Sequence, residues 1–399
     1  MTASPRRTIK VACIIGTRPE ATKVAPLVLA CRDHPALRAM LVDTGQHPDL
    51  VDGALEPFGL TPDVRLSIER VDGSLTELAG GAVAALGRCF REIKPDVVVV
   101  QGDTATTLTG AMAAFWERIP VVHLEAGLRS GDLAAPFPEE ANRRLIVPIV
   151  SLHLAPTTGA ASNLVAEGVD PATILVVGNT SIDAALLLAR ANHTAADAAA
   201  ARGASDGEAD ATGASRTVLI TAHRRESWGE PLARIAGAVA ELAARHDDHL
   251  FVFPLHPNPT VRAAVTPKLA GLENVRLIEP LDYAPFVRLL RSSRLAITDS
   301  GGVQEEAPAL DVPVLVLREV TERPEGIETG AARLVGSDPE RIIEAATVLL
   351  SHEPAWRAMA EAPNPYGDGH AAARSAQAIA ALFGADLSPE PFAIESATA

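Results

Sequence analysis

Short runs of β-branched and apolar residues recur along this chain, and segments with a helical pattern separate them. The first series of runs lies at residues 9–15, 40–43, 96–100, 120–123 and 153–156. A second series lies at residues 217–221, 250–254, 275–278, 295–298, 313–317 and 333–335. Strands that form continuous apolar runs and alternate with helices are typical of parallel sheets covered on both faces. The pattern therefore predicts an α/β chain with two doubly wound, Rossmann-like parallel-sheet domains.

The two series of runs divide the chain into two domains, which a length of 399 residues also favours. We place the first domain at residues 1–180 and the second at residues 181–368. Residues 195–215 are rich in Ala, Gly, Asp and Thr, and we interpret them as a polar insertion near the junction. Residues 369–385 have an Ala-rich helical pattern and predict a C-terminal helix.

The net charge of −15 argues against nucleic acid and anionic membranes as partners, because both require a basic surface. An anionic small ligand is compatible with this charge if a local basic pocket binds it. Cys13, Cys31 and Cys89 are too widely spaced for a disulfide framework or for zinc ligands. The N-terminus has no apolar signal core, and no apolar run is long enough to cross a bilayer. We therefore expect a cytoplasmic protein with reduced thiols.

Carboxylates follow two neighbouring strands of the first predicted domain. Asp103 comes just after one strand, and Glu125 comes just after the next. Ligands of open α/β sheets bind outside the carboxyl ends of the strands, so these two carboxylates are expected to face one crevice. Glu139 and Glu140 follow a Pro-Phe-Pro sequence, and one of them can point inward. The alternatives are a helix cap for Asp103 and a solvated first helical turn for the glutamate pair.

The turn at residues 16–23 leads from the first strand into a helix and carries Arg18 and Lys23. Such a turn directs backbone N–H groups and the helix dipole at an anion, and the two side chains would add positive charge. The glycine spacing fits neither a Walker loop nor a dinucleotide fingerprint. An ordinary turn with solvated charges is the alternative.

Ser300, Gly301 and Gly302 follow a predicted strand of the second domain and begin a helix, a geometry suited to a diphosphate. Glu306 lies about one and a half turns further on, where a carboxylate can accept both hydroxyls of a ribose. Arg323 follows another strand end near the same crevice. The alternative is a glycine turn with a capping carboxylate.

His223 also follows a strand end of the second domain, beside Arg224 and Arg225. It is a candidate proton shuttle or phosphate ligand, because an imidazole can titrate near neutral pH, and burial beside two arginines would disfavour a purely structural role. A structural histidine is the alternative. His256 lies between two prolines in a loop and is a weaker ligand candidate. Together, these groups predict a cleft between the domains that binds a nucleotide sugar.

At these residues the chain resembles the non-hydrolysing UDP-N-acetylglucosamine 2-epimerases, a family with the GT-B fold. The matching segments are residues 16–21 with Lys23, 44–47, 101–104, 123–129, 136–140 with Asn142 and Arg143, 222–226, 300–308, 321–325 and 364–369. They occur in the family's order over most of the chain. The resemblance implies that the C-terminal helix rejoins the first domain and that the protein is a homodimer.

The resemblance also implies roles for individual residues. The catalytic groups would be Asp103, Glu125, Glu139 and His223. Contacts to UDP or its phosphates would come from Arg18, Lys23, His256, Ser300, Gly301, Gly302, Glu306 and Arg323. Many bacterial members bind a second substrate molecule as an activator beside a Gln-His motif, which makes Gln46 and His47 candidate allosteric residues. The chain departs from the family at Ser227, where Asn is usual, and at residues 70–74, which lack a basic pattern.

In this family the reaction is an elimination of UDP to 2-acetamidoglucal, followed by re-addition with the opposite configuration at carbon 2. No carbonyl acidifies the carbon 2 proton, so the reaction needs carboxylates beside an oxocarbenium-like state and cations on the diphosphate. It needs no redox cofactor and no metal, and we expect neither. The alternatives are a related epimerase acting on a modified UDP-sugar in polysaccharide or antibiotic synthesis, a GT-B glycosyltransferase, and a binding protein without catalysis.

Overall fold

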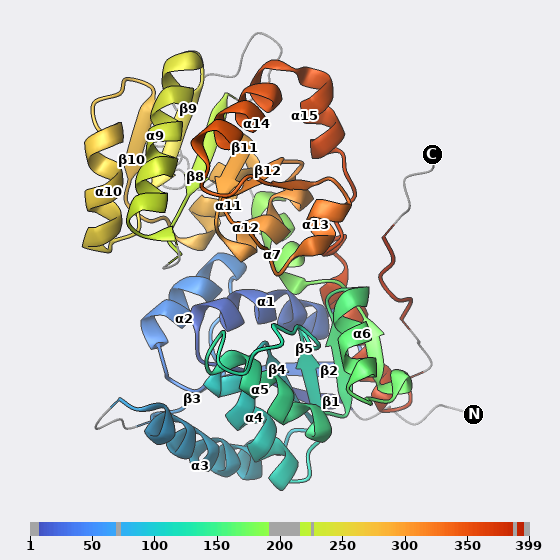
Figure 1. Cartoon of the computed structure of the whole chain (residues 1–399). Helices are drawn as coiled ribbons and strands as arrows, with labels where there is room; N and C mark the ends of the chain where they lie inside the picture. The colour runs from blue at the N-terminus through green and yellow to red at the C-terminus, as the bar shows by residue number, and fades with distance from the viewer. Residues whose placement is uncertain (1–7, 69–72, 191–215, 225–226, 386–388, 395–399) are drawn as a thin grey trace. The chain divides into compact units, whose positions relative to one another are not determined.

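The computed structural model describes residues 8–68, 73–190, 216–224, 227–385 and 389–394 (Figure 1). The polar insertion expected at residues 195–215 therefore lies outside the described residues, as do residues 70–72, Arg225 and Glu226. The chain divides into two compact units. Unit 1 consists of residues 1–184 and 366–393, and unit 2 consists of residues 185–365 and 394–399. From sequence, the divisions were placed at 180/181 and 368/369.

Unit 1 is built around a seven-stranded sheet in which every pair of neighbouring strands is parallel. Its strands are β1 (Ile9–Ile15), β2 (Leu37–Asp43), β3 (Val64–Arg65), β4 (Val97–Gln101), β5 (Val121–Leu124), β6 (Leu152–Ala155) and β7 (Ile174–Val176). Their order in the sheet is β3-β2-β1-β4-β5-β6-β7. The sheet thus reverses its winding between β1 and β4, which is where doubly wound folds bind ligands.

Helices connect the strands of unit 1. They are α1 (Arg18–Asp33), α2 (Pro48–Leu55), α3 (Leu75–Ile93), α4 (Ala105–Trp116), α5 (Glu139–Ile146) and α6 (Thr158–Ala166). The helix α7 (Thr180–Arg190) follows β7, and the division between the units falls within it, after residue 184. One core cluster places Val24, Leu27 and Val28 of α1 with β1 residues, and another packs Ala111 and Ala114 of α4 with the sheet. The strands are buried on both sides, which explains why they read as continuous apolar runs.

The chain returns to unit 1 near its C-terminal end, where α16 (Ala371–Leu382) belongs to the same core cluster as α1 (Figure 1). Asp183 of α7 fixes the start of α16, because its carboxylate accepts hydrogen bonds from the backbone N–H groups of Ala371 (3.3 Å) and Ala372 (2.8 Å). Burial raises the pKa of Asp183 to about 6. A buried carboxylate therefore couples the end of unit 1 to its returning helix.

Unit 2 has a six-stranded parallel sheet of the same design, in the order β10-β9-β8-β11-β12-β13. The strands are β8 (Thr217–Thr221), β9 (Leu250–Pro254), β10 (Val275–Ile278), β11 (Ser293–Thr298), β12 (Val314–Val316) and β13 (Ala332–Leu334). The helices are α9 (Glu230–Arg245), α10 (Pro259–Leu269), α11 (Tyr283–Arg291), α12 (Gly301–Glu306), α13 (Pro324–Glu328), α14 (Pro339–Ser351) and α15 (Glu353–Ala360). The predicted α/β class with two doubly wound parallel sheets is confirmed.

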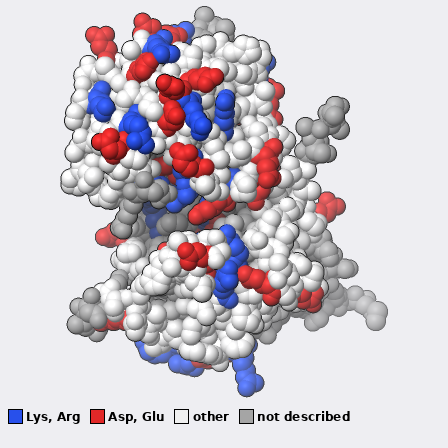
Figure 2. Space-filling view, in the orientation of Figure 1, with Lys and Arg blue, Asp and Glu red and all other residues white. Residues whose placement is uncertain are grey.

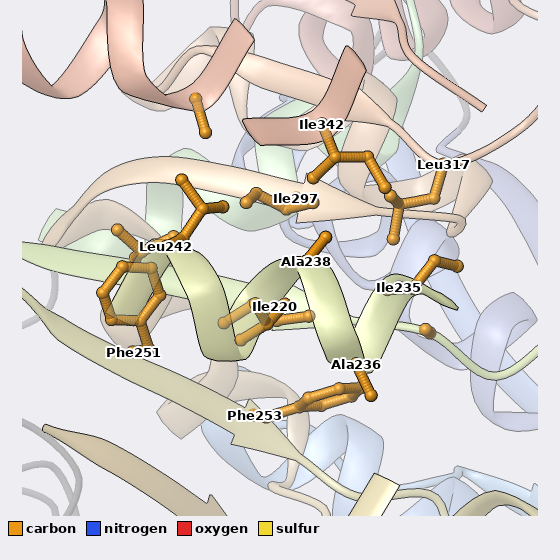
Figure 3. Packing of buried hydrophobic residues seen from close by; sticks show 14 of the residues in the cluster. Ile220, Ile235, Ala236, Ala238, Leu242, Phe251, Phe253, Ile297, Leu317 and Ile342 are labelled. Atoms are coloured by element: carbon orange, nitrogen blue, oxygen red, sulfur yellow. The ribbon is translucent and has the colours of Figure 1, made fainter. Parts of the chain in front are cut away.

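The core of unit 2 lies between α9 and the sheet (Figure 3). Ile235 and Leu242 of α9 pack with Ile220 of β8 and with Phe251 and Phe253 of β9, all of them buried. Full burial of a large apolar side chain contributes about 2–3 kcal/mol to stability. The apolar face of α9 therefore fixes this helix firmly on β8 and β9.

The outer face of unit 2 over α9 and α14 carries basic and acidic side chains interspersed with one another (Figure 2). A surface groove of about 1180 Å³ lies there, with Arg234, Glu241, Arg245 and Glu344 among its lining residues. Opposite charges alternate within it, so it has no single-sign field. Among the described residues, no helix is both long and apolar enough to span a membrane.

Candidate active site

Glu125 lies directly after β5, in a left-handed backbone conformation with φ of 64°. Its carboxylate accepts hydrogen bonds from Lys23 Nζ (2.5 Å), Asn179 Nδ2 (3.0 Å) and Gln101 Nε2. The side chain is only 7% exposed. Left-handed backbone is uncommon outside glycine and is found mostly where the surroundings enforce it. Glu125 is therefore held in one orientation at the carboxyl end of the sheet.

The segment after Glu125 is set by the close approach of α6. Gly127 has φ of 92°, and a Cβ atom there would lie 2.2 Å from the carbonyl oxygen of Ala160. Asn163 Nδ2 of the same helix donates to the Gly127 carbonyl at 3.0 Å. Only glycine fits this position, since it lacks a Cβ atom and tolerates positive φ.

Asp103 follows β4 in the neighbouring turn and is fixed by α5. Its Oδ2 atom accepts hydrogen bonds from Arg143 Nη2 (2.6 Å) and Arg143 Nε (2.9 Å). Its backbone carbonyl accepts one from Asn142 Nδ2 (2.7 Å). A guanidinium that donates two bonds to one carboxylate holds it in a defined orientation. Asp103 is thus a positioned carboxylate with a quarter of its side chain exposed.

The two consecutive glutamates at the start of α5 have different surroundings. The Glu140 side chain is fully buried and accepts hydrogen bonds from Ser130 N (3.0 Å), Arg143 Nη1 (3.0 Å) and Arg144 Nε (3.0 Å). Burial raises its pKa, but these hydrogen bonds outweigh burial and keep the pKa below its ordinary value. Glu139 has a buried Oε2 atom without a hydrogen-bond partner in the described part of the chain. Glu140 therefore has a structural role, whereas the Oε2 atom of Glu139 can accept a hydrogen bond from another group.

His123 begins the matching segment 123–129, and the sequence predicts no role for it. It is buried in β5, and its Nε2 atom lies 2.7 Å from the carbonyl oxygen of Gly102. Burial lowers the pKa of His123 to about 4, so the ring is neutral at pH 7. Since a carbonyl only accepts, Nε2 carries the proton and donates to it. His123 thus ties β5 to the turn that presents Asp103.

Glu20 is a second residue that the sequence did not single out. Its Oε2 atom accepts hydrogen bonds from the backbone N–H groups of Gly16 (2.9 Å) and Thr17 (2.8 Å), and Thr104 Oγ1 donates to its Oε1 atom. Glu20 thus occupies both backbone N–H groups at the start of α1, and the binding of a ligand anion at this turn stays a prediction. Glu20 also connects this turn to the residue after Asp103.

The other predicted unit 1 residues lie around the same strand ends. Arg18 is exposed at the start of α1, and Lys23, on the same helix, contacts Glu125. Gln46 accepts a hydrogen bond from Thr106 Oγ1 at 3.2 Å through its side-chain oxygen. His47 is exposed before α2. The assignment of these residues to UDP or to an activator stays a prediction.

In unit 2, His223 follows β8 and pairs with Asp299, which follows β11. His223 Nδ1 lies 3.3 Å from Asp299 Oδ1, and Asp299 Oδ2 accepts the backbone N–H groups of His223 and Arg224 at 2.8 Å each. His256 stacks on His223 with ring centroids 6.2 Å apart. The His223 side chain is 43% exposed, whereas that of Asp299 is fully buried. A buried carboxylate on Nδ1 orients an imidazole for proton transfer through Nε2.

Ser300 precedes α12, which begins with Gly301 and Gly302. The Arg323 guanidinium lies against this turn, since a Cβ atom on Gly301 would meet Arg323 Cζ at 3.0 Å. Arg323 Nε donates to Glu305 Oε1 at 2.8 Å, which fixes the guanidinium. The small residues and the cation give this turn the character of an anion site. Ser300 itself is less available than expected, because its N–H donates to Thr298 Oγ1 at 2.9 Å.

Glu306 is the last residue of α12 and is buried. Its Oε1 atom accepts a hydrogen bond from the Tyr283 hydroxyl at 3.1 Å. Burial raises the pKa of Tyr283 well above its usual range, so the phenol stays protonated and can donate. Glu306 is thus a carboxylate of fixed orientation, as the recognition of a ribose would require.

Comparisons with known proteins point to one family. A family model described as UDP-N-acetylglucosamine 2-epimerase matches residues 29–380. The UDP-N-acetylglucosamine 2-epimerase of Escherichia coli (strain K12) is 45% identical over 374 residues, which cover 93% of this chain and 98% of that protein. The one from Bacillus subtilis (strain 168) is 42% identical over 376 residues, covering 94% and 96%. A crystal structure of the Neisseria meningitidis UDP-GlcNAc 2-epimerase bound to UDP-GlcNAc is 40% identical, with a TM-score of 0.83 and coverage of 94% of this chain and 100% of that one.

The buried carboxylate of Glu20 makes stability depend on pH. Burial raises its pKa from 4.5 to about 7. Between these values the folded state retains a proton that the unfolded state has released, so the free energy of unfolding falls as the pH rises from 4.5 to about 7. Glu20→Gln removes this titration. The substitution should lower the free energy of unfolding by about 1–3 kcal/mol, because acceptors of hydrogen bonds are lost. This loss should be larger at pH 5 than at pH 8.

Urea unfolding of both proteins at pH 5 and pH 8 measures this difference. Glu56→Gln, at an exposed glutamate, is the matched control and should change neither value. A Glu20→Gln cost that is equal at the two pH values would contradict the account.

Proposed function

Since the chain belongs to the UDP-N-acetylglucosamine 2-epimerase family, we propose that it interconverts UDP-N-acetylglucosamine and UDP-N-acetylmannosamine. The observation that carries the proposal is the buried Glu125 carboxylate, held by Lys23, Gln101 and Asn179 at the end of β5. The reaction inverts carbon 2 of the sugar and needs acid and base groups of fixed position. Asp103, which follows β4, and Glu139, at the start of α5, supply further carboxylates.

The first half of the reaction is an elimination. A carboxylate removes the proton from carbon 2 while the bond between carbon 1 and the UDP oxygen breaks, giving UDP and 2-acetamidoglucal. Because no carbonyl adjoins carbon 2, positive charge develops on the sugar as UDP leaves. Anionic Asp103 and Glu125 would stabilise that charge better than water, since their orientations are fixed beforehand. We assign them to the sugar for this reason.

The second half is the reverse addition on the other face. The UDP oxygen attacks carbon 1 of the glucal, and an acid delivers a proton to carbon 2 from the side opposite to the one that lost it. One carboxylate cannot reach both faces of a flat ring, so at least two acid or base groups are required. Glu139 and His223 are proposed for the remaining roles, Glu139 because one of its buried oxygens has no donor within the described residues.

The UDP group is proposed to bind the turn before α12. Arg323 would neutralise phosphate charge beside Ser300, Gly301 and Gly302, and Glu306 would accept the ribose hydroxyls. His256, stacked on His223, would contact the same nucleotide. In unit 1, Arg18 and Lys23 would add positive charge near the leaving oxygen. Lys23 suits this role because it already lies against a carboxylate at the sugar end of the site.

Gln46 and His47 are proposed as contacts for an activating second substrate molecule. Gln46 is held by Thr106, and His47 offers an exposed ring beside it. A cytoplasmic location is proposed because Cys13, Cys31 and Cys89 are free and buried, which suits a reducing compartment.

Glu125→Gln should abolish most turnover while leaving UDP binding intact. The amide keeps the shape but loses the negative charge, so kcat should fall by at least about 10²-fold. NMR detection of UDP-N-acetylmannosamine formed from UDP-N-acetylglucosamine gives kcat. Asp132→Asn removes an exposed carboxylate seven residues further along the chain and should leave kcat nearly unchanged. Turnover by Glu125→Gln at the parent rate would contradict the proposal. A parent protein that turns over only a modified UDP-sugar would instead be a related epimerase.

We also propose that the protein is a homodimer that uses the end of α4. Phe115 and Trp116 are 50% and 63% exposed and line a surface pocket of about 720 Å³ with Ile119 and Pro120. Large exposed aromatic side chains are typical of protein interfaces. A second copy of the chain is the occupant that the family resemblance implies.

Light scattering after size exclusion tests this interface. Trp116→Asp should convert the dimer to a monomer, because it places a charge in the proposed contact. Val348→Asp, at an exposed apolar position of α14 in unit 2, should leave the dimer unchanged. A monomeric parent protein, or a dimer unaffected by Trp116→Asp, would overturn the interface.

A further inference from the structure

A cluster of metal-ligating side chains lies in unit 2, between the end of α9 and the start of β9. His246, Asp248 and His249 each offer one ligand atom, and these atoms all lie within 4.8 Å of one another. The two imidazole rings meet edge to face with centroids 5.7 Å apart. His246 and His249 are buried, whereas Asp248 is exposed. We propose that these three residues bind a divalent transition-metal ion of the zinc class.

The donor set matches the chemistry of such an ion. Zinc is commonly bound by imidazole nitrogens and carboxylate oxygens at about 2.0–2.2 Å, which separates ligand atoms by roughly 3.3 Å in a tetrahedral site. His249 Nδ1 and Asp248 Oδ1 lie 2.8 Å apart and are hydrogen-bonded, so an ion would replace this hydrogen bond. Small side-chain movements therefore suffice to admit an ion, and water from the exposed Asp248 side would complete its coordination.

The loop that carries the ligands is held in place beforehand. Asn274 Nδ2 donates to three carbonyl oxygens in this region, those of Ala243 (3.0 Å), His246 (3.2 Å) and His249 (3.0 Å). Thr347 Oγ1 of α14 lies 3.3 Å from His246 Nε2. An oxygen on the second nitrogen of a metal-bound imidazole fixes the ring and its tautomer. Because Nε2 of His246 lies beside the Thr347 hydroxyl, we assign Nδ1 of His246 as the nitrogen that binds the ion.

One cation lies beside the cluster. Arg216 Nη1 is 3.7 Å from Asp248 Oδ2, on the carboxylate oxygen that does not contact His249. The Oδ1 atom of Asp248 is therefore the carboxylate oxygen directed at the cluster.

The cluster is separate from the proposed reaction site. His249 immediately precedes β9, so the cluster lies at the amino ends of the strands. His223 and Ser300 follow the carboxyl ends of β8 and β11, which run parallel to β9 in the same sheet. The ion would therefore join the end of α9 to the start of β9 and stabilise unit 2 without taking part in the reaction.

Zinc titration of the full-length protein tests the proposal. We expect one Zn²⁺ per chain by equilibrium dialysis and a rise in Tm of several degrees at saturating Zn²⁺, with no rise in Mg²⁺. The rise follows because an ion that binds only the folded state stabilises it. Asp248→Asn should weaken Zn²⁺ binding at least tenfold and remove the Tm shift. His249→Asn should do the same.

Asp247→Asn is the matched control, since it removes the same charge from the adjacent exposed residue. It should bind Zn²⁺ like the parent protein. Circular dichroism verifies that each variant is folded. Because Asp248 is exposed and His249 is buried, Asp248→Asn is less prone to disturb folding than His249→Asn. The proposal fails if the parent binds no Zn²⁺, if Asp247→Asn and Asp248→Asn weaken binding equally, or if binding is lost on His223→Asn instead.

Discussion

The hydrogen bonds to the Glu125 carboxylate connect segments of unit 1 that are far apart in sequence. Lys23 comes from α1, Gln101 from the end of β4, and Asn179 from the turn before α7. Asn179 in turn donates its backbone N–H to the carbonyl of Tyr366 at 2.6 Å, where the chain returns to unit 1. One buried charge therefore demands donors from several elements at once. This demand explains the left-handed backbone of Glu125, whose cost these contacts offset.

The carboxylates of unit 1 divide into two kinds by how completely they are hydrogen-bonded. Glu20 and Glu140 are buried and receive donors on both oxygens, so they serve the structure of the turns around the site. The Asp103 side chain is partly exposed, and the Oε2 atom of Glu139 has no hydrogen-bond donor among the described residues. Both carboxylates can therefore bind another group. The proposed reaction therefore uses the second kind and Glu125, whose hydrogen-bond donors include the cationic Lys23 side chain.

Sequence patterns predicted most strands because buried parallel strands are continuous apolar runs. They missed β3 and β7, which have only two and three residues and lie at the sheet edges, where the apolar signal is weakest. Motif spacing located Asp103, Glu125 and His223, since strand ends can be recognised locally. It missed Glu20 and Asp299 because their partners, Thr104 and His223, lie 84 and 76 residues away. The His246 cluster was missed because its three side chains converge only through the turn that folding makes between α9 and β9.

The central claim is that carboxylates at the strand ends of unit 1 exchange the carbon 2 proton of a UDP-sugar during elimination and re-addition. Incubation of the protein with UDP-N-acetylglucosamine in deuterated water, followed by NMR, measures this exchange directly. We predict that deuterium enters carbon 2 of both epimers, because the removed proton passes to groups that exchange with solvent. Epimers that form without deuterium at carbon 2, or a substrate that stays unlabelled and unchanged, would contradict the account.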